Sequence, residues 1–315
     1  MRRVISAAVL LLATTLVSTV MGQAPSPFAG RWNLTGTGPD ADHIYWLEIK
    51  DDAGKLSGMF LNRGGSPVPL FVAKVENGEL IFQTGTAARP GPEFRARLKA
   101  DGKLAGSGVE GTRKVMWEGA HPPVWPAANA NGTHTYGAPV VLFDGKSLDA
   151  WGVQDPTKPM NWSIEDGTMT NGDHANNLVS KAKFRDFKVQ AEYKLVADSN
   201  SGIYLRGRYE LQVMMDFGKP VESHGHMSVY SWVPPLVNAT KPVGEWQVME
   251  AVIVGNKVTA VLNGQKVQDN TTIQAITGGA LDADETAPGP LMIQGDHSKV
   301  WYRKVTVTPI TRPGR

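Results

Sequence analysis

Two neighbouring strands decide the fold, and residues 200–216 encode them with the sequence NSGIYLRGRYELQVMMD. Side chains in an extended strand alternate between the two faces of its sheet. In the first strand this alternation puts Ile203 and Leu205 on one face, and Tyr204 and Arg206 on the other. The first face is apolar and is therefore expected to be buried. The second face presents a phenol and a guanidinium to its surroundings.

The second strand of this pair alternates in the same way. Its apolar face carries Leu211, Val213 and Met215, and its polar face carries Glu210, Gln212, Met214 and Asp216. An arginine beside two carboxylates keeps both ionised and can bind a ligand oxygen. A solvated outer face with cross-strand ion pairs has the same pattern. The residues alone therefore leave two interpretations open, a polar ligand site and a plain outer face.

Three histidines are further candidates for chemistry. His224 and His226 lie in a loop shortly before Trp232, and His297 follows an apolar strand pattern. Histidine can transfer protons near neutral pH or ligate a metal. A divalent metal held by the first two histidines and a carboxylate is one expectation, although no tight ligand spacing supports it. Polar loop residues without a ligand are the other, so the cofactor stays open.

The sequence around these strands predicts a two-sheet β-sandwich over residues 140–311. Residues 187–195 alternate between apolar and charged side chains, as on a strand with one buried face. Asn263 and Gly264 form the two-residue turn of a predicted hairpin. Residues 300–309 predict a closing strand, and no amphipathic helix of ten or more residues is evident.

The preceding part of the chain, residues 23–120, predicts a small up-and-down β-barrel. Short strand patterns follow one another through tight turns. The eight candidates are residues 32–37, 44–50, 56–61, 70–75, 80–84, 94–99, 103–109 and 113–117. About eight such strands can close into a barrel. We favour a structural or spacer role for it over a ligand-binding one. Residues 121–139 lack apolar periodicity and predict a linker.

Composition excludes several classes of chemistry. The chain has 315 residues and no cysteine, which rules out disulfides, thiolate metal sites and cysteine nucleophiles. The formal net charge is +2, so the sequence gives no reason to expect a nucleic-acid partner. With 34 glycines and 21 prolines, the chain is rich in turns and suits an all-β protein.

The first 22 residues predict a signal peptide. Arg2 and Arg3 precede an apolar run from residue 4 to residue 20, and small residues follow it. An uncleaved anchor is the alternative, but five serines and threonines weaken the run as a membrane span. We expect a secreted or periplasmic protein that has no membrane contact once the signal is removed.

Nine segments of the second domain carry a resemblance to a known family. They are LFDGKSLDAW (142–151), WSIEDG (162–167), LVSK (178–181), FRDF (184–187), NSGIYLRG (200–207), YELQ (209–212), GEW (244–246), LNG (262–264) and PLMIQGDH (290–297). In this order and spacing they resemble the 3-keto-disaccharide hydrolase domain, which occurs in many exported bacterial proteins. The resemblance implies a concanavalin A-like jelly roll after the barrel, and a carbohydrate substrate bound in a concave groove.

The resemblance also implies a reaction at a sugar whose C3 is a ketone. The ketone acidifies the hydrogen at C2, so a base can remove it, the enolate can expel the C1 substituent, and water can add back. Such a site needs a base, an enolate stabiliser and an acid. We assign Glu210 as base, Arg206 or a metal as stabiliser, and a histidine or Asp216 as acid. The catalytic candidates are thus Glu210, Arg206, Asp216 and His224, and the substrate-binding candidates are Lys181, Asn200, Tyr204, Gln212, His226, Trp232 and His297.

Two other functions stay open at this point. A non-catalytic carbohydrate-binding module needs the groove but no base. A conventional glycoside hydrolase needs two carboxyl groups close together, about 5–9.5 Å apart. Glu210 and Asp216 are six residues apart, which on one strand is ~20 Å at ~3.3 Å per residue. That pair is therefore too far apart unless a bulge intervenes.

Overall fold

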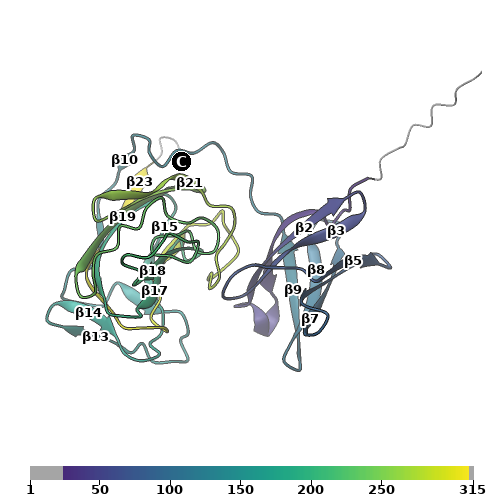
Figure 1. Cartoon of the computed structure of the whole chain (residues 1–315), viewed down its shortest axis with the longest axis horizontal. Coiled ribbons are helices and arrows are strands. Elements are labelled where there is room, and N and C mark those ends of the chain that lie inside the picture. Colours follow the sequence, from purple (N-terminus) through teal and green to yellow (C-terminus); the bar gives the residue numbers. More distant parts are fainter. Residues whose placement is uncertain (1–23, 312–315) are drawn as a thin grey trace, which may run out of the picture.

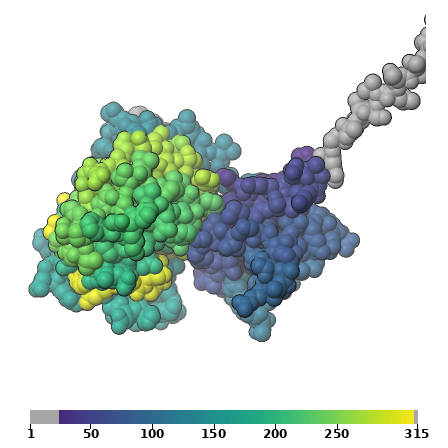
Figure 2. Space-filling model, viewed as in Figure 1, coloured from purple at the N-terminus to yellow at the C-terminus, as the bar shows by residue number. Residues whose placement is uncertain are grey.

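The computed structural model describes residues 24–311, and these form two all-β domains that lie against each other (Figures 1 and 2). Within this range the single helical element is a short 3-10 turn, Gly38–Asp40. The predicted all-β class is therefore confirmed. The predicted signal peptide, residues 1–22, lies outside the described residues. In the described part of the chain, no helix is long and apolar enough to cross a membrane.

The first domain is one curled antiparallel sheet of nine strands. They are β1 (Gly30–Gly36), β2 (Ile44–Asp52), β3 (Lys55–Asn62), β4 (Val68–Pro69), β5 (Val72–Glu76), β6 (Glu79–Gly85), β7 (Pro90–Leu98), β8 (Leu104–Glu110) and β9 (Arg113–Ala120). The strand order is β4-β3-β2-β1-β9-β8-β7-β6-β5. Consecutive strands of this domain therefore pair, except β4 with β5, and β1 also pairs with β9, as in an up-and-down barrel. The seam lies between the consecutive strands β4 and β5, where Leu70 donates to Gly58 and Phe71 donates to Gln83.

Aromatic rings fill the interior of this barrel. Tyr45, Phe60, Phe82 and Phe94 are buried, with neighbouring ring centroids 4.7–6.1 Å apart. Gly108 is required beside them, because a Cβ there would lie within 3.0 Å of the Phe94 ring. Rings packed at this spacing contribute more than their buried area alone.

The second domain is a sandwich of two antiparallel sheets (Figure 1). The larger sheet contains β10 (Thr135–Tyr136), β11 (Val140–Phe143), β13 (Trp162–Glu165), β14 (Thr168–Asn171), β16 (Phe187–Leu195), β19 (Trp246–Val254), β20 (Lys257–Leu262), β21 (Gln265–Thr272) and β23 (Val300–Thr311). The smaller sheet contains β12 (Trp151–Val153), β15 (Leu178–Phe184), β17 (Asn200–Leu205), β18 (Tyr209–Met214) and β22 (Gly289–Ile293), in the order β12-β15-β22-β17-β18.

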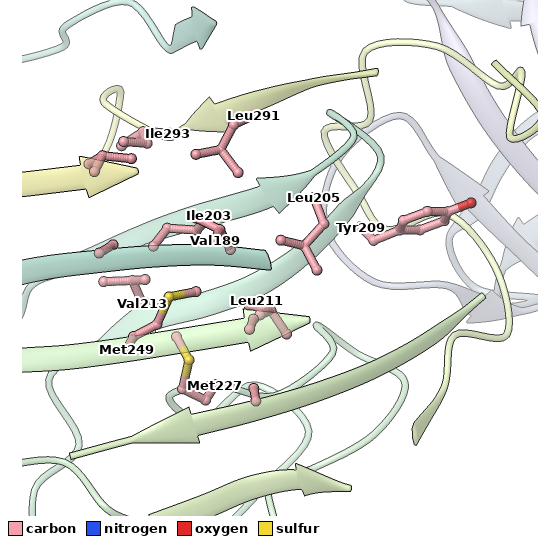
Figure 3. Packing of buried hydrophobic residues seen from close by; sticks show 14 of the residues in the cluster. Val189, Ile203, Leu205, Tyr209, Leu211, Val213, Met227, Met249, Leu291 and Ile293 are labelled. Atoms are coloured by element: carbon pink, nitrogen blue, oxygen red, sulfur yellow. The ribbon is translucent and has the colours of Figure 1, made fainter. Parts of the chain in front are cut away.

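The core lies between the two sheets. Side chains from β17 and β18, such as Ile203 and Val213, face Val189 and Met249 of the larger sheet (Figure 3). Burying each such side chain contributes about 1.5–3 kcal/mol. The alternation predicted for residues 187–195 is confirmed, because every second residue is buried. The predicted turn at Asn263 and Gly264 and the closing strand β23 are present as well.

One expectation about the two deciding strands is wrong. The period-two pattern was expected to place Arg206 on the face of Tyr204, but β17 ends at Leu205. Arg206 and Gly207 have positive φ angles of 56° and 67°, so the chain turns there before β18 begins. Alternation holds only inside a strand, and the Arg206 side chain therefore follows the turn rather than the sheet face. Asp216 likewise lies beyond Met214, the last residue of β18.

An apolar interface joins the domains. Trp46 on the outside of the barrel packs edge-on against Trp232, with ring centroids 5.0 Å apart. Ile44 and Leu61 belong to the same buried cluster as the sandwich core. Asn33 donates a hydrogen bond of 2.7 Å to Glu285. The barrel is therefore packed against the sandwich, and a loop of the barrel reaches the site described below.

Candidate active site

A cavity of about 290 Å³ opens where the smaller sheet meets the first domain. β17 and β18 supply Asn200, Tyr204, Glu210 and Gln212. The barrel supplies Gly64 and Gly65. Other segments of the sandwich supply the remaining lining residues, which are Gln154, Asn177, Tyr230, Gly278, Gly279, Gln294, Asp296 and His297. This lining is rich in carboxyl, amide and hydroxyl groups, which suit the hydroxyls of a sugar. Five of the residues predicted for the site are therefore brought together here, namely Asn200, Tyr204, Glu210, Gln212 and His297.

Glu210 is the buried acid of this cavity. It is 3% exposed and lies directly across from Tyr204 in the ladder between β17 and β18. Burial raises the pKa of its carboxyl group to about 8, although the Tyr204 hydrogen bond acts in the opposite direction. A carboxyl group with this pKa is a stronger base when ionised than an exposed one.

The Tyr204 hydroxyl connects Glu210 to the loop at residues 278–279. It lies 2.8 Å from Glu210 Oε2 and 2.9 Å from the carbonyl oxygen of Gly278. Burial raises the pKa of Tyr204 well above its usual value, so the phenol keeps its proton. One proton serves one acceptor at a time. The phenol can donate to an ionised Glu210, or donate to Gly278 and accept from a protonated Glu210.

His297 and Asp296 form a second titratable pair in the cavity. His297 Nδ1 lies 2.7 Å from Asp296 Oδ1, and the imidazole is about half exposed. The hydrogen bond to Asp296 raises the pKa of His297, and the charge of Glu210 adds to this effect. The imidazole therefore keeps a proton to higher pH than a free histidine does, which suits a proton donor.

Gln212 provides an oriented amide. Its side-chain oxygen accepts a hydrogen bond of 2.8 Å from the backbone N–H of Val213, which leaves Nε2 as a donor toward ligand. Asn200, at the start of β17, brings a second amide to the same cavity. Neutral donors of this kind can stabilise an oxyanion.

Arg206 does not reach this cavity, so its expected position beside Glu210 is wrong. The side chain is 1% exposed, donates to the Arg185 carbonyl and to Asp186 Oδ1, and lies over the Trp125 ring. Burial lowers the pKa of its guanidinium. Its contacts instead hold the turn after β17 against the rest of the sandwich.

Asp216 and His226 form a buried structural cluster. Asp216 accepts hydrogen bonds from the His226 backbone N–H at 2.8 Å and from Thr240 at 2.7 Å. His226 Nε2 lies 2.6 Å from the Tyr193 hydroxyl, and burial lowers the pKa of the imidazole. Neither residue lines the cavity with Glu210. Asp216 and His226 thus fasten the loop after β18.

The remaining predicted residues lie at the domain interface or on the surface. His224 Nε2 is 2.7 Å from Ser66 Oγ of the barrel, and Trp232 packs against Trp46. Lys181 is exposed on β15. None of the three lines the cavity. Among residues 24–311, no three His, Asp or Glu side chains are grouped to hold a metal ion.

Some residues that line the cavity were not among the site residues predicted from the sequence. Gln294 and Asp296 belong to the segment 290–297 that carries the family resemblance, so that resemblance was a usable signal for them. Gly64 and Gly65 come from another domain, and no local pattern indicates their contact with the site. A larger hollow of about 550 Å³ lies along residues 121–128 and contains none of the predicted site residues.

Comparisons with known proteins point to one family. A family model described as a 3-keto-alpha-glucoside-1,2-lyase-like domain matches residues 138–308. A 3-keto-disaccharide hydrolase of Bacteroides thetaiotaomicron is 24% identical in an alignment of 164 positions that covers 41% of this chain. The chain spans 57% of that relative's length.

Two solved structures are similar to part of the chain. Both come from Parabacteroides distasonis ATCC 8503 and were proposed to be glycosyl hydrolases. The first is 28% identical with a TM-score of 0.49, and covers 60% of this chain and 92% of that one. The second is 20% identical with a TM-score of 0.47, and covers 55% and 94%.

Proposed function

Since the chain belongs, through residues 138–308, to the family of 3-keto-alpha-glucoside-1,2-lyase-like domains, we propose that it is a carbohydrate-active enzyme that cleaves 3-keto-glycosides. The observation that carries this proposal is Glu210, a buried carboxyl group with a pKa of about 8 in a polar cavity. A binding module needs hydrogen-bonding groups in such a cavity but no base. Burying a carboxyl group disfavours its charged form, and a pKa shifted in this way is typical of a catalytic group.

Glu210 acts as the general base in the proposed reaction. It removes the proton from C2, which is acidic because C3 is a ketone, and the electron pair moves onto the ketone oxygen as an enolate. While Glu210 is ionised, the Tyr204 phenol donates to it. When Glu210 takes the proton, the phenol turns to the Gly278 carbonyl. The Tyr204 hydroxyl therefore has a hydrogen-bond acceptor in both protonation states of Glu210.

The Gln212 and Asn200 amides stabilise the enolate oxygen in this proposal. They replace Arg206, whose guanidinium is committed to Asp186 behind the cavity. Amide donors fixed by the protein need no reorganisation when charge develops. The hydrogen bond from Val213 fixes the orientation of the Gln212 amide in this way.

His297 is the proposed acid for the leaving group. The enolate collapses, the C1–C2 double bond forms, the C1–O bond to the leaving group breaks, and the imidazolium protonates the departing oxygen. Water then adds across the double bond, with its oxygen going to C1 and a proton to C2. The sum is one 3-keto-glycoside plus one water giving one 3-keto-sugar plus one alcohol.

The test is to incubate a 3-keto-disaccharide with the full chain and with Glu210→Gln, and to quantify the released 3-keto-sugar. We expect turnover by the wild type and a loss of about a thousandfold in the variant. Glu192→Gln is the matched control, since Glu192 lies on the larger sheet and pairs with Arg303. Unchanged turnover in Glu210→Gln would rule out this base, and no turnover by the wild type would rule out the activity.

We also propose that the protein is exported, on the basis of the charged start and apolar run in residues 1–22. Expression in a Gram-negative host followed by N-terminal sequencing of the periplasmic form tests this. A first residue at or near position 23 is expected, whereas recovery of the uncut chain from the cytoplasm would contradict it.

A further inference from the structure

The loop between β3 and β4 fastens the barrel onto the active-site cavity. The carbonyl oxygen of Arg63 accepts a hydrogen bond of 2.8 Å from the N–H of Gly279. Ser66 Oγ lies 2.7 Å from His224 Nε2 and 2.8 Å from Ser231 Oγ. A Cβ at Gly278 would lie within 3.0 Å of the loop backbone. The two domains therefore meet without a gap at this point.

This loop belongs to the wall around Glu210. Gly64 and Gly65 line the 290 Å³ cavity. The segment that the loop contacts, residues 278–279, also holds the carbonyl group that accepts from Tyr204. The barrel is therefore part of the environment of the proposed base, although the family match covers residues 138–308 of the sandwich.

A second cavity of about 770 Å³ lies next to the first. Both cavities are lined by Gln154, Asn177 and Asp296, so they share one wall. The barrel contributes Asp42 and Arg63 to the second cavity. The sandwich contributes further polar groups, among them Asp155, Lys158 and His174. Acceptors and donors thus face the cavity from both domains.

The composition of this second cavity suits an uncharged, hydroxyl-rich group. Its charged side chains are of both signs, and Arg63 Nη2 lies 3.8 Å from Asp42 Oδ2 across the barrel surface. Lys158 pairs with Asp155 at 3.1 Å on the sandwich side. Such pairs offer a sugar both donors and acceptors and leave little net field to attract an ion.

We propose that this interdomain cavity is the binding site for the leaving group of the substrate, a second sugar unit, and that the barrel determines leaving-group specificity through Arg63 and Asp42. This rests on the proposed function, which places the 3-keto-sugar beside Glu210. The leaving oxygen then points toward the shared wall, where His297 neighbours Asp296. The barrel accordingly serves as half of a substrate site rather than as a spacer.

The experiment compares a 3-keto-disaccharide with the methyl 3-keto-glucoside, which lacks the second sugar. For Arg63→Ala in the full chain we expect KM for the disaccharide to rise about tenfold, since a hydrogen bond to a charged group is lost. KM for the methyl glycoside should stay within twofold. Lys158→Ala, on the other wall, should act in the same direction. Arg97→Ala is the control, because Arg97 is an exposed arginine on β7 that pairs with Glu79 of β6.

Binding separates this proposal from the proposed function. Each variant is titrated with the two glycosides while tryptophan fluorescence is monitored. The resulting dissociation constants report the contact with the second sugar without requiring turnover. Weaker disaccharide binding by Arg63→Ala supports the site even if the wild type proves inactive. If the wild type turns over both glycosides and both variants match it on each, the leaving-group site is overturned while the activity stands. Equal losses on both glycosides also overturn it.

Discussion

Gly202 lies against the carboxyl group of Glu210. The two residues are on the paired strands β17 and β18, and a Cβ at position 202 would lie within 3.0 Å of Glu210 Oε1, Cδ and Cγ. Real Cβ atoms do not approach this closely, so any other residue would displace the glutamate. The absence of a side chain at Gly202 therefore makes room for the carboxyl group at its place in the cavity.

The first prediction follows from this contact. Gly202→Ala is expected to reduce kcat on a 3-keto-glycoside by about tenfold to a hundredfold, because it misplaces the base by roughly an ångström. Gly152→Ala is the matched control in the same sheet, where a Cβ would meet only the Val179 carbonyl at 3.8 Å. Steady-state kinetics with circular dichroism tests both variants. A Gly202→Ala enzyme with full kcat would show that the position of Glu210 is unimportant.

The second prediction concerns Tyr204. Its hydrogen bond lowers the pKa of Glu210 from the value that burial alone would produce. An ionised base is needed, so wild-type kcat/KM should rise with pH through about 8. Tyr204→Phe should move this rise about one pH unit higher. Tyr209→Phe, which removes another buried tyrosine–glutamate bond, of 2.6 Å to Glu285, should leave the rise in place. A profile unchanged by Tyr204→Phe would contradict the assignment.

The sequence could predict the site wherever alternation within a strand decides the outcome. Tyr204, Glu210 and Gln212 lie on β17 and β18, and the period-two pattern correctly placed them on one side of the sheet. The same rule placed Arg206 and Asp216 on that side as well, but both residues lie just past the ends of those strands. The backbone turns at these points, so their side chains meet Asp186 and Thr240 instead of the cavity.

Long-range contacts could not be predicted from local patterns. Gly64 and Gly65 lie in a turn of the barrel, and nothing in their own neighbourhood indicates that they meet residues 278–279 of the sandwich. The packing of Trp46 against Trp232 brings them there. Similarly, the pattern showed that Glu210 lies on a polar face, but only the packed structure shows that it is buried and has a raised pKa.

The third prediction tests His297 as acid. His297→Gln should lower kcat about a hundredfold for a substrate with a sugar leaving group. It should have little effect on a nitrophenyl 3-keto-glucoside, whose leaving group departs without a proton. Asp296→Asn should give an intermediate loss, because the aspartate raises the pKa of the imidazole through their hydrogen bond. Equal losses of His297→Gln on both substrates would instead assign His297 to binding.

The last prediction concerns stability, and its sign follows from the pKa of Glu210. In the folded protein this pKa is raised from 4.5 to about 8, so the protonated form is favoured by folding. This contribution is fully present below pH 4.5 and is lost as the pH rises through about 8. Relative to acidic pH, the loss reaches about 3 kcal/mol at pH 7 and about 5 kcal/mol above pH 8.

Glu210→Gln cannot ionise, so it should match the wild type near pH 4.5 and become progressively more stable than it from pH 5 to pH 8. Urea unfolding at several pH values measures this difference, and Glu192→Gln, at a partly exposed ion pair on β16, should show no such growth. A constant difference between Glu210→Gln and the wild type across this range would mean that Glu210 has an ordinary pKa. The same variant is expected to be inactive, because the buried charge that destabilises the fold is the charge that removes the C2 proton.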